Sequence, residues 1–148
     1  MCLMMEKSEL SAEKEKIFEI ILIDDDSIFC FLVSKMIQSF TNMKIDLKIF
    51  SDGIIALNHL NALHIKGVAF PNVLLVDINM PLMNGWQFLE ELESMKIFAG
   101  IDVPRVLIVS SSVSQEDLAR ANKIPYIERY LTKPFTAEQL FQALNVSN

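Results

Sequence analysis

The chain has 148 residues, the length of a single domain. Acidic residues outnumber basic ones by 19 to 13, and the formal charge of −6 argues against binding nucleic acid or an anionic membrane through bulk charge. Apolar residues make up 51% of the sequence, which excludes general disorder. Two cysteines, Cys2 and Cys30, cannot form a disulfide framework, and no apolar stretch reaches the roughly 18 residues of a spanning helix. With no secretory signal, we expect a reducing, cytoplasmic location.

The first 16 residues end in the charged run Glu13-Lys14-Glu15-Lys16 and read as a loosely ordered extension. The apolar start over residues 1–5 meets charged residues at once, so it is too short for the apolar region of a signal peptide. We therefore expect an extension over residues 1–16 and one domain over residues 17–148.

Beyond residue 17, short apolar runs alternate with segments of helical periodicity. Three runs are unbroken and rich in β-branched residues, which is typical of strands buried on both faces of a parallel sheet: residues 20–23, 73–76 and 106–109. Residues 44–50 alternate polar and apolar side chains, and residues 127–131 form a short mixed segment. These two segments are typical of edge strands, which stay partly exposed.

Five helices are expected, beginning near residues 27, 53, 85, 114 and 136; the second runs to about residue 64 and the third to about residue 97. Ser27 is a candidate N-cap of the first helix. The expected apolar face of that helix consists of Phe29, Leu32, Val33, Met36, Ile37 and Phe40. Ser114 with Asp117, and Thr136 with Gln139, have the spacing of N-terminal capping residues.

Five strands alternating with five helices predict a doubly wound α/β domain, the (βα)5 flavodoxin-like three-layer sandwich. Right-handed crossovers and the edge character of residues 44–50 and 127–131 select a parallel sheet with the order 2-1-3-4-5. In this order, ligands bind beyond the carboxyl ends of strands 1 and 3. The sheet pattern thus locates the site before any motif is used.

Polar residues follow the strands at that edge of the sheet. Strand 1 is followed by Asp24-Asp25-Asp26, strand 3 by Asp77, strand 4 by Ser110-Ser111-Ser112, and strand 5 by Thr132-Lys133-Pro134. Each group alone is an ordinary cap, turn or surface feature. Together they bring several carboxylates into one crevice, where like charges need a cation or a proton. Oxygen ligands without cysteine or histidine indicate Mg²⁺, with Mn²⁺ as the alternative.

The same residues suit phosphoryl transfer, which needs mainly positioning and charge neutralisation. A hydroxyl at Ser110 and an ammonium at Lys133 can hold phosphate oxygens beside the cation. An aspartate carboxylate can itself be the nucleophile and form an aspartyl phosphate. Asp77 ends the central strand, between the other groups, and is therefore the best nucleophile candidate.

Four segments resemble the receiver domain of two-component response regulators. They are residues 23–26, the Asp-x-x-Met-Pro-x-Met-x-Gly pattern over residues 77–85, residues 108–111, and Lys133-Pro134-Phe135. The resemblance covers about residues 18–145, nearly the whole chain, and points to a stand-alone regulator similar to single-domain chemotaxis regulators.

The resemblance implies that this chain is a phosphoprotein and that Asp77 is its phosphoacceptor. The phosphoryl group would come from a phosphohistidine on a sensor histidine kinase or on a histidine phosphotransfer protein. The resemblance also implies a Mg²⁺ site. In that site, Asp24, Asp25 and Asp77 supply carboxylates and Asn79 supplies its backbone carbonyl. Asp26 matches a position without a fixed role, so it is expected to cap the first helix.

The resemblance assigns Lys133 to the phosphoryl oxygens, Ser110 to the switch hydroxyl, and Tyr130 to the aromatic side chain whose rotamer follows that switch. It further implies a cis peptide bond at Lys133-Pro134. Residues 123–126, Lys-Ile-Pro-Tyr, depart from the Gly-Ala that receivers often have before strand 5, which affects the expected shape of the output face.

A phosphoacceptor switch, rather than a turnover enzyme, is the expected activity. Phosphorylation would switch a protein-interaction surface on helix 4, strand 5 and helix 5, so we expect a downstream protein target and no contact with nucleic acid or membrane. His59 and His64 are expected at the surface, away from the crevice.

Two other hypotheses remain. Asp24-Asp25-Asp26 can also be read as the nucleophile motif of haloacid-dehalogenase-like phosphatases, but that reading needs a later acidic motif, and only Glu138 follows Lys133. The third hypothesis is a binding scaffold with a receiver fold and no phosphotransfer.

Overall fold

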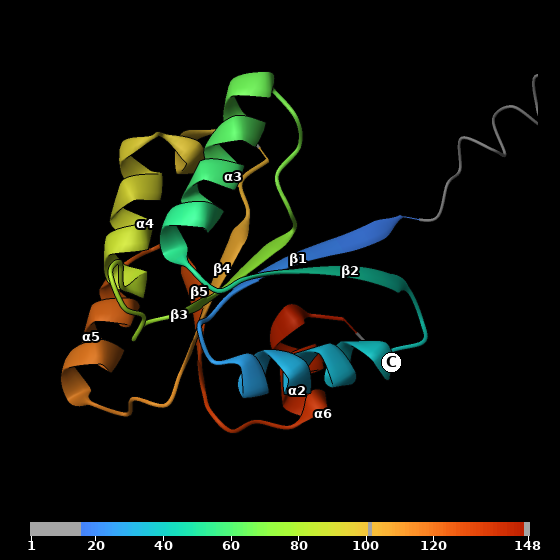
Figure 1. The fold of residues 1–148 in the computed structure, drawn as a ribbon. Helices are drawn as coiled ribbons and strands as arrows, with labels where there is room; N and C mark the ends of the chain where they lie inside the picture. The colour runs from blue at the N-terminus through green and yellow to red at the C-terminus, as the bar shows by residue number, and fades with distance from the viewer. Residues whose placement is uncertain (1–15, 101, 147–148) are drawn as a thin grey trace, which may run out of the picture.

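The computed structural model describes residues 16–100 and 102–146, so the expected N-terminal extension lies outside the described residues except for Lys16. A parallel five-stranded sheet forms the middle layer, with the order β2-β1-β3-β4-β5 (Figure 1). The strands are β1 (Ile17–Ile23), β2 (Lys44–Phe50), β3 (Val73–Asp77), β4 (Arg105–Ser110) and β5 (Ile127–Thr132). The predicted strand order is confirmed.

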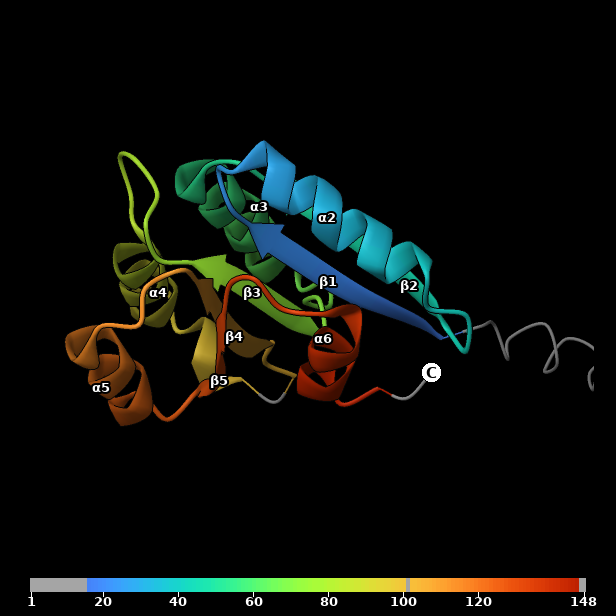
Figure 2. The same cartoon turned by 90° about the horizontal axis from the view of Figure 1, so that it is seen from below.

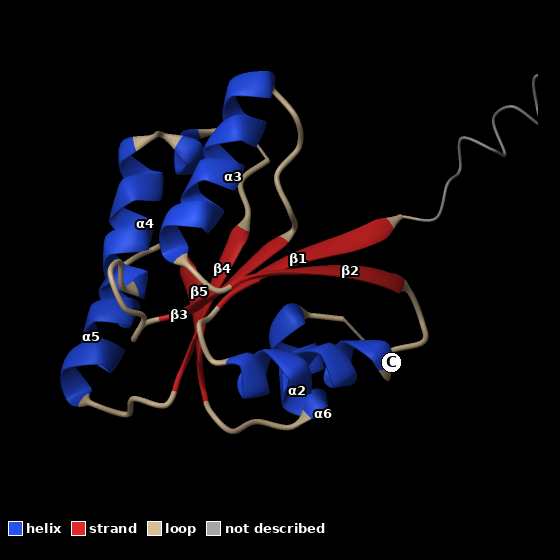
Figure 3. Cartoon of the chain, in the orientation of Figure 1, coloured by secondary structure: helices blue, strands red, loops and turns tan. Residues whose placement is uncertain are grey.

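Helices cover both faces of the sheet, and α2 and α6 lie on the opposite face from α3, α4 and α5 (Figure 2). The helices are α2 (Ser27–Gln38), α3 (Gly53–Lys66), α4 (Gly85–Ser94), α5 (Gln115–Lys123) and α6 (Ala137–Leu144), with a short 3₁₀ helix, η1 (Ile97–Ala99). The alternation of strands and helices along the chain, visible in Figure 3, is the predicted three-layer α/β architecture.

Side chains of alternate residues in the central strands point to opposite faces of the sheet and pack into two separate apolar cores. Ile20, Leu22 and Val73 face the core under α2 and α6. Ile21 and Ile23 face the core under α3 and α4. Every residue of β3 is buried, as its unbroken apolar sequence predicts. β2 and β5 are partly exposed along their length, which confirms their prediction as edge strands.

The start of α2 differs from the prediction. The N-cap is Asp26, whose Oδ1 accepts the backbone N–H groups of Ile28 and Phe29 at 3.0 and 3.1 Å, so the Ser27 assignment is wrong and the cap role of Asp26 is confirmed. Leu32 is 49% exposed and does not face the core. Each helical residue turns about 100°, which carries Leu32 away from the face that buries Val33.

The third predicted helix ends early. α4 ends at Ser94, and Lys96 takes a left-handed backbone conformation with φ 63°. Ile97 is nevertheless 1% exposed, because η1 returns the chain to the core. The apolar periodicity therefore runs on past the true end of the helix.

Among the described residues, no helix combines the length and apolar character needed to cross a membrane.

Candidate functional site

The carboxyl ends of β1 and β3 bring three aspartates together. Asp24 and Asp77 are 1% and 5% exposed, whereas Asp25 is exposed. Carboxylate oxygens of Asp24, Asp25 and Asp77 lie within 4.8 Å of one another. This donor set is all oxygen, open to solvent through Asp25, and suits a hard cation such as Mg²⁺, which binds through one or two carboxylates and keeps several waters.

Lys133 reaches into this cluster from the end of β5. Its Nζ donates to Asp24 Oδ2 at 2.6 Å and to Asp77 Oδ1 at 3.4 Å. The Lys133-Pro134 bond is cis, as predicted, and the backbone N–H of Lys133 donates to the carbonyl of Ser110 at 2.9 Å. The neighbouring strand end therefore fixes the backbone from which the ammonium projects.

The aromatic ring of Phe29 also contacts the Lys133 ammonium. The Phe29 ring centroid lies 4.0 Å from Lys133 Nζ, and Phe29 packs edge to face against Phe135 at 5.7 Å. A cation over an aromatic face is stabilised by the ring quadrupole. Phe29 was predicted only as a core residue, since its sequence signal is the ordinary apolar periodicity of α2.

Burial sets the charge state of the cluster. Burial and, to a smaller extent, the nearby Asp24 carboxylate together raise the pKa of Asp77 to about 6, against the opposing effect of Lys133. Burial also raises the pKa of Asp24, against the hydrogen bond from Lys133. Burial alone would lower the pKa of the Lys133 ammonium, but its bonds to the two aspartates outweigh that effect and raise it. The cluster is thus a site for positive charge.

The loop that follows Asp77 folds back against the backbone of Asp77 and Ile78. The N–H of Gly85 donates to the carbonyl of Ile78 at 2.8 Å, and a Cβ atom at Gly85 would lie 2.3 Å from the carbonyl oxygen of Asp77. Only glycine fits this approach. Asn79 lies in this loop, two residues past Asp77, and is exposed. Asn84 caps α4 through a capping box with Gln87.

Ser110 ends β4 and is fully buried. Its Oγ accepts the backbone N–H of Ser112 at 3.1 Å. The hydroxyl of Tyr130, on β5, donates to the carbonyl of Ser112 at 2.8 Å. Ser110 and Tyr130 are therefore connected through one residue of the β4–α5 loop rather than by direct contact.

Sequence reasoning missed the side-chain role of Asp117. It was predicted only as a partner of the Ser114 cap, and the structure does show that cap, from the Asp117 N–H to Ser114 Oγ at 3.1 Å. Its carboxylate also accepts the Ser112 hydroxyl at 2.7 Å and the Trp86 indole N–H at 3.3 Å. Nothing in the spacing of these residues separates this bridge from a simple cap.

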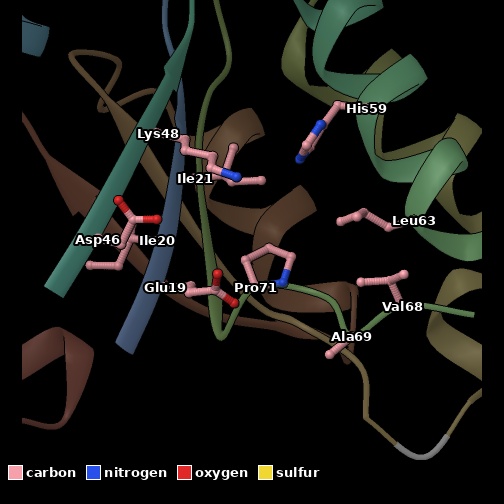
Figure 4. A pocket seen from close by; sticks show the side chains of 10 residues that line it. All are labelled: Glu19, Ile20, Ile21, Asp46, Lys48, His59, Leu63, Val68, Ala69 and Pro71. Atoms are coloured by element: carbon pink, nitrogen blue, oxygen red, sulfur yellow. The ribbon is translucent and has the colours of Figure 1, made fainter. Parts of the chain in front are cut away.

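A cavity of about 230 Å³ lies elsewhere, between α3 and the strands β1 and β2. Figure 4 shows His59 and Leu63 pointing from α3 toward it. His59 is half-buried, with its ring 5.2 Å from that of Phe50, and burial, aided by Lys48, lowers its pKa. None of the predicted site residues lines this cavity.

The alternative phosphatase reading finds no support in this geometry. Glu138 lies in the first turn of α6 and is exposed, and the acidic group at the strand ends consists of Asp24, Asp25 and Asp77 without it. The late acid that this reading requires therefore does not join the cluster.

Comparison with known proteins agrees with the geometry. The response regulator receiver domain family matches residues 20–145. The crystal structure of a two-component response regulator from Cytophaga hutchinsonii is 31% identical, with a TM-score of 0.72, and the alignment covers 89% of this chain and 96% of that one.

Two curated relatives differ in size. A probable methanogenesis regulatory protein, FilR2, from Methanothrix harundinacea is 27% identical over 130 residues, covering 86% of this chain and 79% of that protein. A protein-glutamate methylesterase/protein-glutamine glutaminase from Clostridium acetobutylicum is 33% identical over 113 residues, which are 76% of this chain but only 29% of that protein. The shared part is the receiver-like unit. With the family matching most of its length, this chain belongs to the response regulator receiver domains of two-component systems.

Proposed function

We propose that Asp77 accepts a phosphoryl group in a Mg²⁺-dependent reaction, with a sensor histidine kinase or a histidine phosphotransfer protein as the donor. The observation that carries this proposal is the buried Asp77 carboxylate beside Asp24 and Asp25, with the Lys133 ammonium 3.4 Å away. A carboxylate in this position can act as a nucleophile. The negative charge of the phosphorylated product would then lie beside the ammonium of Lys133, which stabilises it.

In the transfer, an Asp77 oxygen attacks the phosphorus of the phosphohistidine. The new O–P bond gives an acyl phosphate, while the P–N bond breaks and the imidazole nitrogen leaves with the electron pair. A bound Mg²⁺ supplies charge neutralisation, and Asp24, Asp25, Asp77 and the Asn79 carbonyl would hold it. Lys133, already aimed at Asp77, pairs with a phosphoryl oxygen.

Ser110 and Tyr130 are the proposed switch residues. Ser110 turns its hydroxyl toward the phosphoryl group, and Tyr130 follows because both are bonded to Ser112. Tyr130 lies on β5 and lines a surface hollow together with Leu118 and Asn122 of α5, so its movement would alter the surface of α5, β5 and α6. We propose this surface as the output site for a protein target, and the protein as a cytoplasmic switch rather than a turnover enzyme.

We also propose that residues 17–148 form the receiver unit and that residues 1–16 are an extension to it. The described fold supports this boundary, since β1 begins at Ile17 and α6 closes the second layer of the sandwich at Leu144.

Incubation with a small phosphodonor and Mg²⁺ tests the phosphoacceptor. The intact mass should rise by one phosphate, and the gain should vanish with EDTA or in Asp77→Asn. Asp46→Asn is the matched control, because Asp46 is an exposed aspartate on β2, away from the cluster. A chain that gains no phosphate, or a gain that persists in Asp77→Asn, would refute the proposal.

A further inference from the structure

β2 is an open edge of the sheet. Within the described residues it pairs with β1 alone, in unbroken register along all seven of its residues. Side chains on both of its faces are exposed: Asp46 and Lys48 on the α3 side, and Ile49, at 41%, on the other. The helix layers therefore leave this edge uncovered. A long, regular and uncovered edge strand is a template for pairing with another strand.

The opposite edge of the sheet is less regular. The pairing of β5 with β4 shifts in register between Val106 and Leu107, so that Glu128 is an extra residue in β5. A bulge of this kind disrupts the ladder of hydrogen bonds and blunts an edge against further pairing. Glu128 also forms an ion pair with Arg105. β2 is thus the edge that is better suited to strand addition.

The main chain of β2 shows which residues face outward. The carbonyl of Phe50 accepts the backbone N–H of Asp24 at 3.0 Å, so the polar main-chain groups of Phe50 point toward β1. These groups alternate in direction along a strand. The outward N–H and carbonyl groups therefore belong to Ile45, Leu47 and Ile49. An antiparallel partner strand must pair with these three residues.

A second copy of β2 fits this edge in one register. When two β2 strands run antiparallel and are centred on Leu47, Asp46 lies opposite Lys48 of the second copy, and the two-fold axis repeats the pair. This register pairs all seven residues of the strand. Centring on Asp46 instead sets Asp46 opposite Asp46 and Lys44 opposite Lys48, and like charges directly opposite one another are destabilising.

We propose that two copies of this chain associate through β2, antiparallel and centred on Leu47, to form one continuous sheet. Each outward residue then exchanges two main-chain hydrogen bonds with the residue opposite it. Ile45 lies opposite Ile49 of the second copy, which covers the exposed Ile49 side chain. The Asp46–Lys48 pairs on the other face select the register, because they are satisfied in this alignment.

This dimer leaves the proposed phosphoacceptor and output surface free. β2 and β5 lie at opposite edges of the sheet, so α5, β5 and α6 of each copy are outside the contact. Because the strands run antiparallel, the two Asp77 sites lie at opposite ends of the joined sheet. Association should therefore not depend on phosphorylation, and variants of Asp46 should accept phosphate as the wild type does.

Sedimentation equilibrium of the full chain over a concentration series tests the contact. We expect a reversible monomer–dimer equilibrium that is the same with and without Mg²⁺ and beryllofluoride, a phosphoryl mimic. Lys48→Asp sets acid against acid at both cross-strand pairs, and Asp46→Lys sets base against base. Each should raise the dissociation constant about tenfold or more.

Lys44→Asp is the matched control. It makes the same charge change on the same face of the same strand, but in the proposed register Lys44 lies opposite Phe50 and not opposite a charge. Its dissociation constant should stay within about threefold of the wild-type value. Thermal denaturation followed by circular dichroism checks that each variant remains folded.

Two combinations should restore the dimer. An equimolar mixture of Lys48→Asp and Asp46→Lys brings two acids opposite two lysines, so a heterodimer should form more tightly than either variant alone. The double variant Asp46→Lys/Lys48→Asp exchanges the charges and should dimerise as the wild type does. Misfolding of the single variants would produce neither recovery.

The proposal is overturned if the wild-type chain stays monomeric at about 1 mM, or if Lys48→Asp and Asp46→Lys dimerise as Lys44→Asp does. It is also overturned if neither combination recovers the dimer, or if the dimer requires beryllofluoride. Failure of the proposed phosphorylation is a separate result, because Asp77 would then gain no phosphate whatever the state of association.

Discussion

Lys133 Nζ lies 2.6 Å from Asp24 Oδ2, and the Asp24 side chain has no exposed surface. Removing one partner of such a pair leaves the other charge buried and unpaired, which is strongly destabilising. We expect Lys133→Met to lower the free energy of unfolding at pH 7 by about 2–3 kcal/mol in urea denaturation without Mg²⁺.

The second partner provides the control for this prediction. Asp24→Asn in the Lys133→Met background should recover most of the loss, because no unpaired Asp24 charge remains. Lys123→Met, at an exposed position in the last turn of α5, should change stability little. An equal loss in Lys123→Met, or no recovery in the double variant, would contradict the ion-pair explanation.

Asp77→Asn should make the protein more stable at pH 8. The folded-state pKa of Asp77 is about 6, above its ordinary value of 3.8, because burial and Asp24 disfavour its charge. The folded protein therefore holds this proton more tightly than the unfolded chain, and wild-type stability falls as pH rises from about 4 to 6. Asp77→Asn removes this titrating group, so its free energy of unfolding at pH 8 should exceed that of the wild type by about 1–3 kcal/mol.

The pH dependence of that gain is its check. As the pH falls through 3.8, the wild-type carboxyl becomes protonated in the unfolded chain as well as in the folded protein, so the advantage of Asp77→Asn should disappear. Denaturant midpoints measured from pH 4 to 8 would show the two proteins converging at the acidic end. A constant difference across this range would mean that packing, not charge, separates them.

Mg²⁺ should stabilise the wild-type protein by neutralising the Asp24, Asp25 and Asp77 cluster. We expect a Mg²⁺-dependent rise in Tm at pH 8 that is reduced in Asp25→Asn. At pH 5, below the Asp77 pKa of about 6, a proton competes for the site and the rise should be smaller. The same rise in Asp24→Asn/Asp77→Asn would place the ion elsewhere.

The strand order and the edge where the acids meet were predictable because they follow from patterns that repeat along the chain. Unbroken apolar runs mark the buried strands, and the alternation in residues 44–50 marks an edge. Parallel strands then bring Asp24 and Asp77 to one edge whatever their side chains do. The N-cap of α2 was harder to predict, because Asp26 and Ser27 are adjacent and both residue types are good N-caps.

Contacts between side chains distant in sequence were not predictable. Phe29 lies against Lys133, yet the pattern that predicts Phe29 as buried is shared by every core residue of α2. Asp117 binds Ser112 and Trp86 through its carboxylate, while the sequence shows only the spacing of a cap. Such contacts depend on rotamers and helix positions, which periodicity does not specify.

Gly85→Ala should destabilise the protein and disturb the loop after Asp77. A Cβ atom there would lie 2.3 Å from the Asp77 carbonyl oxygen and 3.0 Å from the Ile78 Cα, so the backbone of the nucleophile must shift. Overpacking of this kind costs about 1–3 kcal/mol. Gly100→Ala is the matched control, since a Cβ at Gly100 meets nothing within 4 Å and its φ is −82°. Urea denaturation should separate the two variants, and phosphorylation by a small donor should slow only in Gly85→Ala. If both glycines tolerated alanine equally, the close approach of Gly85 to Asp77 would not be a constraint in solution.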